Sequence, residues 1–181
     1  MPKIYLINVG ANAAHQAKVR SPLFKDGTFE FITFPDDCGA KYPTTLKGFV
    51  RNATYTHLDP DWKNLTYGDN CSNARASALQ KALAGDILLF WALLWKVDNR
   101  SSDVFAESEK GWFLIGAQRI ECVLESGDPL DELTPSQRKR ARWNAHVTAG
   151  TSVDGNNEKT RVFIGDHYCP VKNWLTAVLL R

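Results

Sequence analysis

The chain has 181 residues, a formal net charge of +2, and 44% hydrophobic and 11% aromatic residues. This length suits a single domain over residues 1–181, and the apolar content excludes global disorder. The four cysteines are far apart, without a CxxC pair or zinc-ligand spacing to histidine, so we expect no bound metal. The chain opens without a secretion signal and has no apolar run of 18 residues, which favours a cytoplasmic protein with reduced thiols.

The first 78 residues are predicted to contain two strands and a long loop. Residues 3–10 are apolar on both faces, which predicts a strand covered on both sides. The turn signal Asp26-Gly27 precedes residues 29–33, whose alternating pattern predicts a second strand. Residues 36–78 keep no period and are dense in polar and aromatic side chains, so we expect a functional loop on a rigid scaffold.

A pair of strands is predicted at the centre of the chain. Nine apolar residues, Ile87–Trp95, are too few to span a membrane and are typical of a buried strand. A short helix and the turn Gly85-Asp86 lead into this strand. After a polar insert, residues 112–124 carry charged residues on one face and apolar residues on the other, which predicts a half-exposed strand.

The last third of the chain is predicted to hold a capped helix, a strand and a terminal helix. Thr134 is the expected N-cap, followed by a proline and by Gln137 at the capping-box position. Residues 161–165 predict a strand, and residues 171–181 a helix with one apolar side. Five to six strands and three short helices in mixed order predict an α+β domain with a curled sheet or small β-barrel.

The segment 57–69 holds the candidate catalytic groups. The chain has no Walker loop, GxGxxG fingerprint, nucleophile elbow or HExxH motif. His57, Asp59 and Asp69 offer acid–base groups or ligands for a polar molecule. The alternative is that the aspartates belong to turns and that His57 and Tyr67 are hydrogen-bonded packing residues.

A basic run lies on the predicted helix after Thr134. It comprises Arg138, Lys139, Arg140 and Arg142. One interpretation is a solvated helix face, and the other is a patch that contacts phosphates. The neighbouring Trp143 would then stack on a base or buttress the helix.

The remaining tryptophans and histidines have structural interpretations as well as functional ones. Trp91, Trp95 and Trp112 lie at strand positions, where core packing is the default. A tryptophan facing a barrel mouth would instead form a wall for a flipped base. His146 and His167 stand among neutral neighbours, as structural hydrogen-bonding histidines commonly do.

Several blocks of sequence resemble a known family. LAGDILLFWALLW (83–95) followed by GWFLIGAQRIECVL (111–124) resembles the PUA-like superfamily, with its EVE and ASCH groups, in which a GD-strand belongs to a small β-barrel. Together with SPLFKDGTFEFITFPDD (21–37) and HLDPDWKNLTYGD (57–69), these blocks are similar to the third type of nucleotide modification associated domain. That family is associated with DNA base hypermodification. One departure is TFPD (33–36), where a proline-rich end to the second strand is expected.

The resemblance implies a PUA/EVE-like barrel that acts on, or recognises, a modified nucleobase in DNA. Our first hypothesis is a reader of a modified or flipped base that serves a bacterial or phage modification or restriction system. The residues that match the family's loop motifs, and are expected to line the base pocket, are Ser21, Phe24, His57, Asp59, Tyr67 and Asp69. Trp91 and Trp112 are the expected stacking wall, and the basic run is expected to contact the backbone.

Two alternatives to a reader of modified DNA stay open. The chain would be an enzyme that processes a modified base, with His57 and Asp59 or Asp69 as acid and base, or an RNA-binding PUA-like module. We expect no cofactor, no membrane contact, and a nuclease or modification enzyme as a partner.

Overall fold

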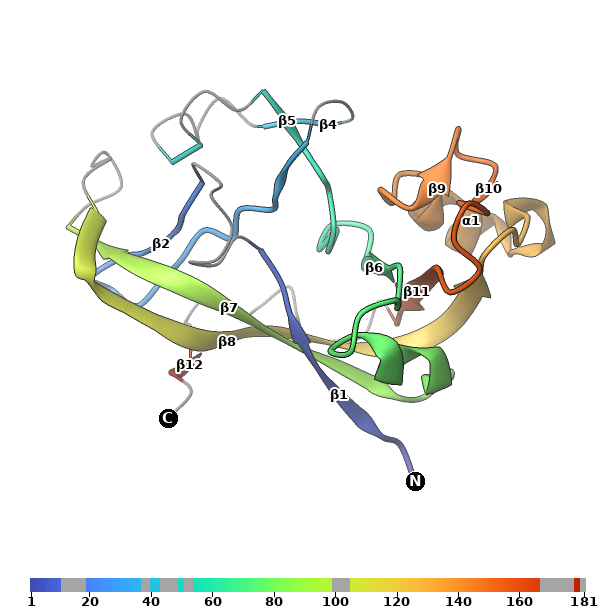
Figure 1. Cartoon of the computed structure of the whole chain (residues 1–181), viewed down its shortest axis with the longest axis horizontal. Coiled ribbons are helices and arrows are strands. Elements are labelled where there is room, and N and C mark those ends of the chain that lie inside the picture. The colour runs from blue at the N-terminus through green and yellow to red at the C-terminus, as the bar shows by residue number, and fades with distance from the viewer. Residues whose placement is uncertain are drawn as a thin grey trace. The chain divides into compact units, whose positions relative to one another are not determined.

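The structure is a computed structural model (Figure 1), and it describes residues 1–10, 19–36, 40–42, 49–50, 54–98, 105–166 and 178–179. Contacts between Cα atoms divide the chain into two compact units. Unit 1 comprises Met1–Ile7, Leu58–Leu89 and Ala117–Lys172, and unit 2 comprises Asn8–His57, Phe90–Gly116 and Asn173–Arg181. Strands β7 (Ile87–Val97) and β8 (Phe105–Glu125) run across the boundary, so each contributes to both units.

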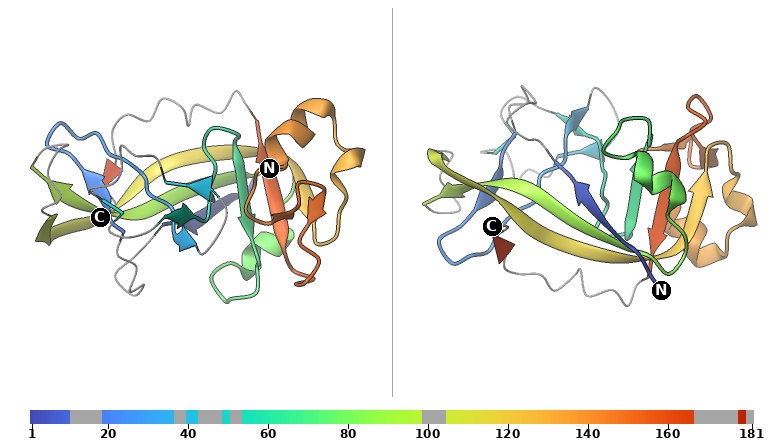
Figure 2. Two further views of the ribbon diagram at one scale, coloured as in Figure 1. Left: turned by 90° about the horizontal axis from the view of Figure 1, so that it is seen from above. Right: turned by 60° about the horizontal axis from the view of Figure 1, so that its bottom comes forward.

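Unit 1 combines the antiparallel pairs of β11 (Arg161–Gly165) with a parallel contact between β1 (Ile4–Asn8) and β7. Strands β1, β11 and β6 (Thr66–Asp69) accompany the unit's parts of β7 and β8. Strand β11 pairs with β6 on one side and with β8 on the other, and β6 and β11 lie side by side in both views of Figure 2. The hairpin of β9 (Val147–Thr148) and β10 (Ser152–Val153) lies near the helix α1 (Pro135–Ala141) in Figure 1.

Unit 2 combines a parallel pair with a small antiparallel sheet. Strand β2 (Ser21–Leu23) pairs in parallel with β7, and β12 (Val178–Leu179) pairs antiparallel with β8. The short strands β3 (Pro35–Asp36), β4 (Ala40–Lys41) and β5 (Tyr55–Thr56) form a sheet in the order β3-β5-β4. The chain is therefore mostly β with mixed pairing.

Each unit has its own apolar core. In unit 1 the core includes Leu124, Leu130, Ala141, Val162 and Ile164. In unit 2 it includes Val19, Phe24, Ile32, Leu93 and Trp95. Burial of these side chains supplies the main favourable term for each unit, because each removes apolar surface from water.

The elements predicted around the two central strands are confirmed. A 3₁₀ helix, η2 (Ser77–Lys81), leads to a turn at Gly85, whose φ of +92° favours glycine, and β7 follows. In β8, Arg119 and Glu121 are exposed while Ile120 and Leu124 are buried, as the alternation predicts.

The capping box predicted for α1 is confirmed. The Thr134 hydroxyl accepts a hydrogen bond from the Gln137 backbone N–H at 3.3 Å, and the Gln137 side chain accepts one from the Thr134 N–H at 3.1 Å. Two backbone donors at the helix start are thereby satisfied. The 3₁₀ helix η3 (Leu130–Glu132) precedes this cap.

The predicted cover on both faces of the first strand is wrong. Strand β1 stands at the end of the strand order, and Ile4 and Leu6 are 65% and 56% exposed. Its apolar residues reflect strand propensity as much as burial.

The strand predicted at 29–33 is also wrong. The Ser21 hydroxyl accepts a hydrogen bond from the Ile32 N–H at 3.0 Å and donates one to the Ile32 carbonyl at 3.5 Å, so a side chain takes the place of a strand ladder there. The strands form instead at β2 and β3.

Four further expectations need correction. The α+β class becomes mostly β, because α1 has only seven residues. Among the described strands no closed barrel is found. In the predicted terminal helix, residues 178–179 are strand β12, and the other residues of 171–181 lie outside the described part. The predicted 36–78 loop contains β4, β5 and β6 within its described stretches, and η2 begins at its end.

Candidate functional site

The centre of the candidate site in unit 1 is a buried carboxylate. Asp59 is 7% exposed, and its two oxygens accept hydrogen bonds from the Gly68 N–H at 2.8 and 3.0 Å. The Asn144 amide donates to Asp59 Oδ1 at 3.2 Å and to the Thr66 hydroxyl at 3.3 Å. Because an unpaired buried carboxylate is costly, these donors are what make its burial tolerable.

His146 completes the cluster around Asp59. Its Nε2 lies 3.5 Å from Asp59 Oδ2, and its backbone N–H donates to Asn144 Oδ1 at 2.9 Å. Burial lowers the pKa of His146, but the hydrogen bond and charge of Asp59, with the charges of Asp69 and Asp154, outweigh burial and raise the pKa above its ordinary value. The imidazole is therefore held in its protonated form to higher pH than a solvated histidine.

Gly68 lets the His146 ring approach the β6 backbone. A Cβ at this position would lie 2.4 Å from His146 Cδ2 and 2.8 Å from Asn144 Oδ1. Both distances are shorter than any van der Waals contact. A residue without a side chain is thus needed where β6 meets the turn after α1.

Tyr67 and Asp69 form a second polar pair on β6. The Tyr67 hydroxyl donates to Asp69 Oδ2 at 2.7 Å, and its ring stacks on Phe163 at 6.1 Å between centroids. The other carboxylate oxygen of Asp69 accepts the Cys71 N–H at 2.6 Å. Burial and the neighbouring carboxylates raise the pKa of Tyr67 well above its usual value, and burial with the charge of Asp69 raises the pKa of Cys71 to about 12. Both groups are neutral at physiological pH.

Unit 1 thus brings together three of the predicted base-binding residues: Asp59, Tyr67 and Asp69. The prediction for His146 as a structural hydrogen bonder agrees with its bond to Asp59. Asn144 was not expected at all. No local signal marks it, since its partner Asp59 lies 85 residues away in the sequence.

The other predicted pocket residues belong to unit 2. Ser21 is 4% exposed and bonded to Ile32, and Phe24 packs edge-on against Phe49, with centroids 6.3 Å apart. His57 Nδ1 lies 3.4 Å from Asp36 Oδ2. These contacts position the side chains within unit 2, and their role in base binding stays a prediction.

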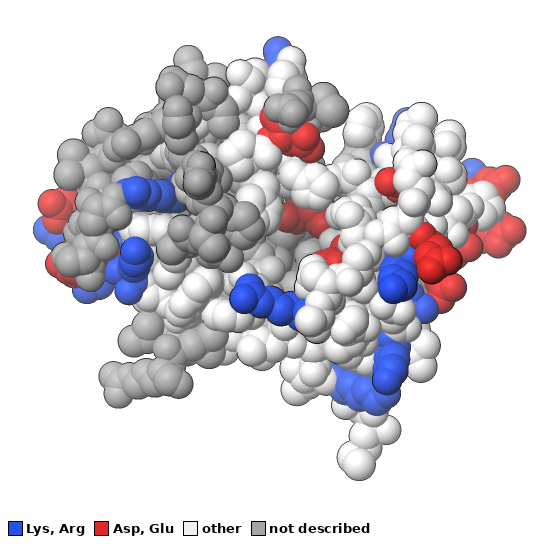
Figure 3. All heavy atoms as spheres, in the orientation of Figure 1, with Lys and Arg blue, Asp and Glu red and all other residues white. Residues whose placement is uncertain are grey.

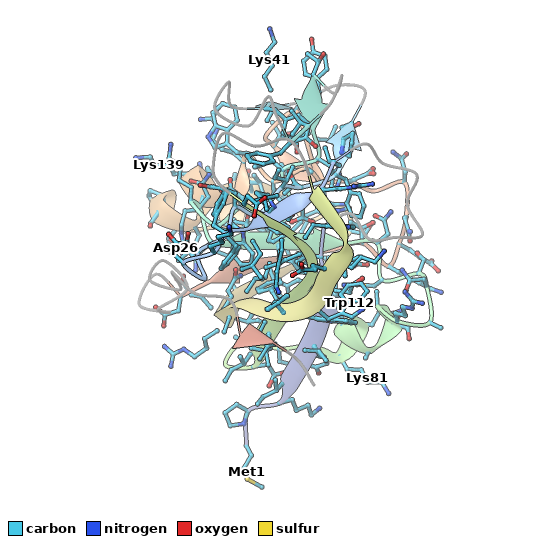
Figure 4. All side chains as sticks on the ribbon, turned by 90° about the vertical axis from the view of Figure 1, so that its left-hand side faces the viewer. Met1, Asp26, Lys41, Lys81, Trp112 and Lys139 are labelled. Carbon is cyan, nitrogen blue, oxygen red and sulfur yellow. The ribbon has the colours of Figure 1, made fainter. Side chains whose placement is uncertain are left out.

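Trp91 and Trp112 form an aromatic pair in unit 2. Their ring centroids lie 4.6 Å apart at an interplanar angle of 54°, and both side chains are half-buried. Trp112 lies on β8 (Figure 4) and packs against the core of the unit. Trp95 is 4% exposed, as core packing predicts, with the Arg20 guanidinium 5.7 Å from its ring centroid.

The basic run on α1 divides into two groups. Arg138 donates to the carbonyls of Leu130, at 3.0 Å, and Leu133, at 3.3 Å. Arg140 donates to the Gly165 carbonyl and forms an ion pair with Glu121. Both guanidinium groups therefore hold the helix onto its own unit.

Lys139 and Arg142 form the second group, and both are exposed. Lys139 points away from the ribbon in Figure 4. In Figure 3, acidic and basic side chains lie next to one another on the side that carries α1, β9 and β10. The helix α1 therefore does not present a continuous basic face on this surface.

Comparison with known proteins completes the description of the chain. In the part of it that the structure describes, no helix combines the length and apolar character needed to cross a bilayer. Neither a curated protein nor a solved structure matches the chain. The family model described as nucleotide modification associated domain 3 matches residues 3–169 of the 181. The resemblance carried by the sequence blocks is thereby confirmed, and the chain belongs to the nucleotide modification associated domain 3 family.

Proposed function

We propose that this chain recognises a modified nucleobase in DNA, in the service of a DNA modification or restriction system. Membership of a family associated with nucleotide modification supports a nucleotide or nucleic acid as the ligand. The single observation that carries the proposal is the half-buried pair Trp91 and Trp112 in unit 2. Every nucleobase has a π face, so an aromatic surface serves recognition of any of them.

The tryptophan pair is suited to stacking because it is fixed before any ligand arrives. Trp91 and Trp112 lie on the neighbouring strands β7 and β8, and Trp112 packs on the core of unit 2. Side chains already held in place lose little conformational entropy on binding. A base displaced from its duplex would stack on the accessible indole surface, with polar groups of the pocket reading its edge.

The finer features of the proposal are the PUA/EVE-like arrangement and the pocket residues. The β7–β8 pair that follows the Gly85 turn supports such an arrangement. Ser21, Phe24 and His57 lie in the same unit as the tryptophans, and we propose that they support or line that pocket. A nuclease or a modification enzyme would act on the DNA that the chain marks.

A binding assay with duplex DNA and RNA tests this function. The duplexes carry an unmodified, methylated, hydroxymethylated or glucosylated base, and each is titrated at two salt concentrations. We expect one modified base in DNA to bind more tightly than its unmodified counterpart. Selective binding of RNA would favour the RNA-binding alternative, and equal weak binding of all duplexes would refute recognition of a modified base.

Substitutions at Trp112 connect this selectivity to the tryptophan pair. Trp112→Leu keeps apolar packing but removes the aromatic face, whereas Trp112→Phe keeps both. Since stacking on an aromatic side chain contributes about 1–3 kcal/mol per base, Trp112→Leu should weaken binding of the selected duplex at least about fivefold. Trp112→Phe should retain most of the affinity. Equal affinities of the two variants would remove Trp112 from the base-binding site.

The second candidate is an enzyme that processes a modified base. The observation that favours it is His146, whose imidazole is oriented by Asp59 and has a raised pKa. A histidine oriented by a carboxylate is a common general acid or base. Mass spectrometry of the bound oligonucleotides after incubation would detect an altered base. If alteration occurs and His146→Gln stops it without reducing binding, the enzyme interpretation holds; unaltered oligonucleotides refute it.

A further inference from the structure

Trp143 is a large aromatic side chain left on the surface of unit 1. It is 61% exposed, although its neighbours Ala141 and Asn144 are 0% and 2% exposed. Ala141 ends α1 against the core, and Asn144 is bonded to Asp59 and Thr66. The backbone is thus fixed on both sides, and the indole is directed outward by this geometry. Leaving this apolar surface in water forgoes the stabilisation that its burial would bring.

Arg142 lies directly against this tryptophan. The guanidinium carbon is 5.0 Å from the Trp143 ring centroid, which is the distance of a cation–π contact. Lys139 precedes Arg142 by three residues and therefore lies on the same side of the helix end. Arg138 is bonded to backbone carbonyls and Arg140 is paired with Glu121, whereas neither Lys139 nor Arg142 has an ion-pair partner among the described residues. Two exposed positive charges thus flank one exposed indole.

We propose that Lys139, Arg142 and Trp143 form a contact site for an unpaired strand of nucleic acid. One base stacks on the accessible surface of the Trp143 indole, and the flanking phosphates meet Arg142 and Lys139. The proposal rests on the proposed function only in taking nucleic acid as the ligand. It adds a second contact, in unit 1, that does not read the modification.

The chemistry of the three side chains selects this occupant. An indole covered on one side by a guanidinium presents its remaining surface to a flat ring, and stacking of a base there tolerates any sequence. The two cations complement phosphates rather than an acidic or neutral apolar surface. Bases within a duplex have both faces covered by their neighbours, so the strand must be unpaired at this point.

Fluorescence anisotropy with labelled oligo(dT) and oligo(rU) tests the site in the full chain. Trp143→Ala should weaken binding of at least one strand about fivefold or more, and Trp143→Phe should restore most of the loss. Lys139→Ala should make the dependence of log K on log salt shallower by about 0.7. Lys81→Ala, which removes an exposed lysine of unit 1 on η2, is the matched control and should leave affinity within twofold. The stronger of the two strands identifies DNA or RNA as the ligand.

Three outcomes would overturn the proposal. Binding of both strands by Trp143→Ala as tight as that of the unsubstituted chain would exclude a stacking role. Equal losses of affinity in Trp143→Ala and Trp143→Phe would also exclude a stacking role. An unchanged salt dependence of binding in Lys139→Ala would exclude the phosphate contact of Lys139. The melting temperature of each variant is measured alongside its affinity. Since Trp143 is exposed, its replacement should not unfold the chain, and the melting temperatures should agree.

The same assay separates this site from the reader of modified bases. Replacement of Trp143 should weaken the binding of modified and unmodified strands by the same factor, because stacking does not distinguish them. Replacement of Trp112 should reduce the ratio of the affinity for the modified duplex to that for the unmodified duplex. The results can therefore refute the proposed function and support the Trp143 site, or support the proposed function and refute the Trp143 site.

Discussion

Gly68→Ala is the most direct perturbation of the Asp59 cluster. The added methyl group would lie 2.4 Å from His146 Cδ2 and 2.9 Å from His146 Cγ, so the imidazole must move away from β6. That movement takes Nε2 away from Asp59 Oδ2, now 3.5 Å distant, and disturbs the Asn144 amide as well. Overpacking of this kind costs about 1–3 kcal/mol. For a chain of 181 residues, each kcal/mol lowers Tm by roughly 2–4 °C.

Thermal and urea denaturation measure that loss, and NMR titration follows the imidazole. We expect the pKa of His146 to fall from its raised value towards the ordinary one, since the bond and charge of Asp59 are what raise it. Gly155→Ala is the matched control, because the nearest heavy atom to its added Cβ is 4.0 Å away, and it should change stability by less than about 0.5 kcal/mol. Equal stability of the two variants, or an unchanged His146 pKa in Gly68→Ala, would refute the packing argument.

Three further predictions follow from hydrogen bonds and burial. Since its pKa is raised in the folded chain, His146 adds stability that is complete below its ordinary value of 6.5 and is lost as pH rises through the folded pKa, so the stability gap to His146→Gln in urea titrations should narrow with rising pH. The Cys71 thiol, fully buried and with a pKa raised to about 12, should react with iodoacetamide more slowly than the half-buried Cys122, as peptide mass spectrometry would show; faster labelling of Cys71 contradicts its burial. Thr134→Ala removes the N-cap of α1 and should cost about 0.5–2 kcal/mol in urea denaturation, whereas Ser136→Ala on the same helix should be nearly neutral.

Features that depend on neighbours in the sequence could be predicted. The capping box of Thr134 and Gln137 and the turn at Gly85 are local, and both are confirmed. The alternation in β8 reports one buried face and is also confirmed. Periodicity does not reveal which strand lies at an edge, so the exposure of Ile4 in β1 was not foreseen.

Features that depend on distant partners could not be predicted. The hydroxyl of Ser21 replaces ladder bonds at Ile32, and no pattern within residues 29–33 announces this. Arg138 and Arg140 look like surface charges in the sequence, but their guanidinium groups donate hydrogen bonds to backbone carbonyls of their own unit. Asn144 contributes to the candidate site only because the fold brings it to Asp59.

The bond between Asp59 and Asn144 has a consequence for the making of the protein. On a ribosome that adds roughly 5–20 residues per second, the 85 residues between them take about 4–17 s to synthesise. Throughout that interval the carboxylate of Asp59 lacks its amide donor, and unit 1 lacks the segment that holds His146. A nascent chain is therefore expected to keep the Asp59 region hydrated until residue 144 has left the exit tunnel, and unit 1 is completed only when β11, which follows in the chain, pairs with β6 and β8.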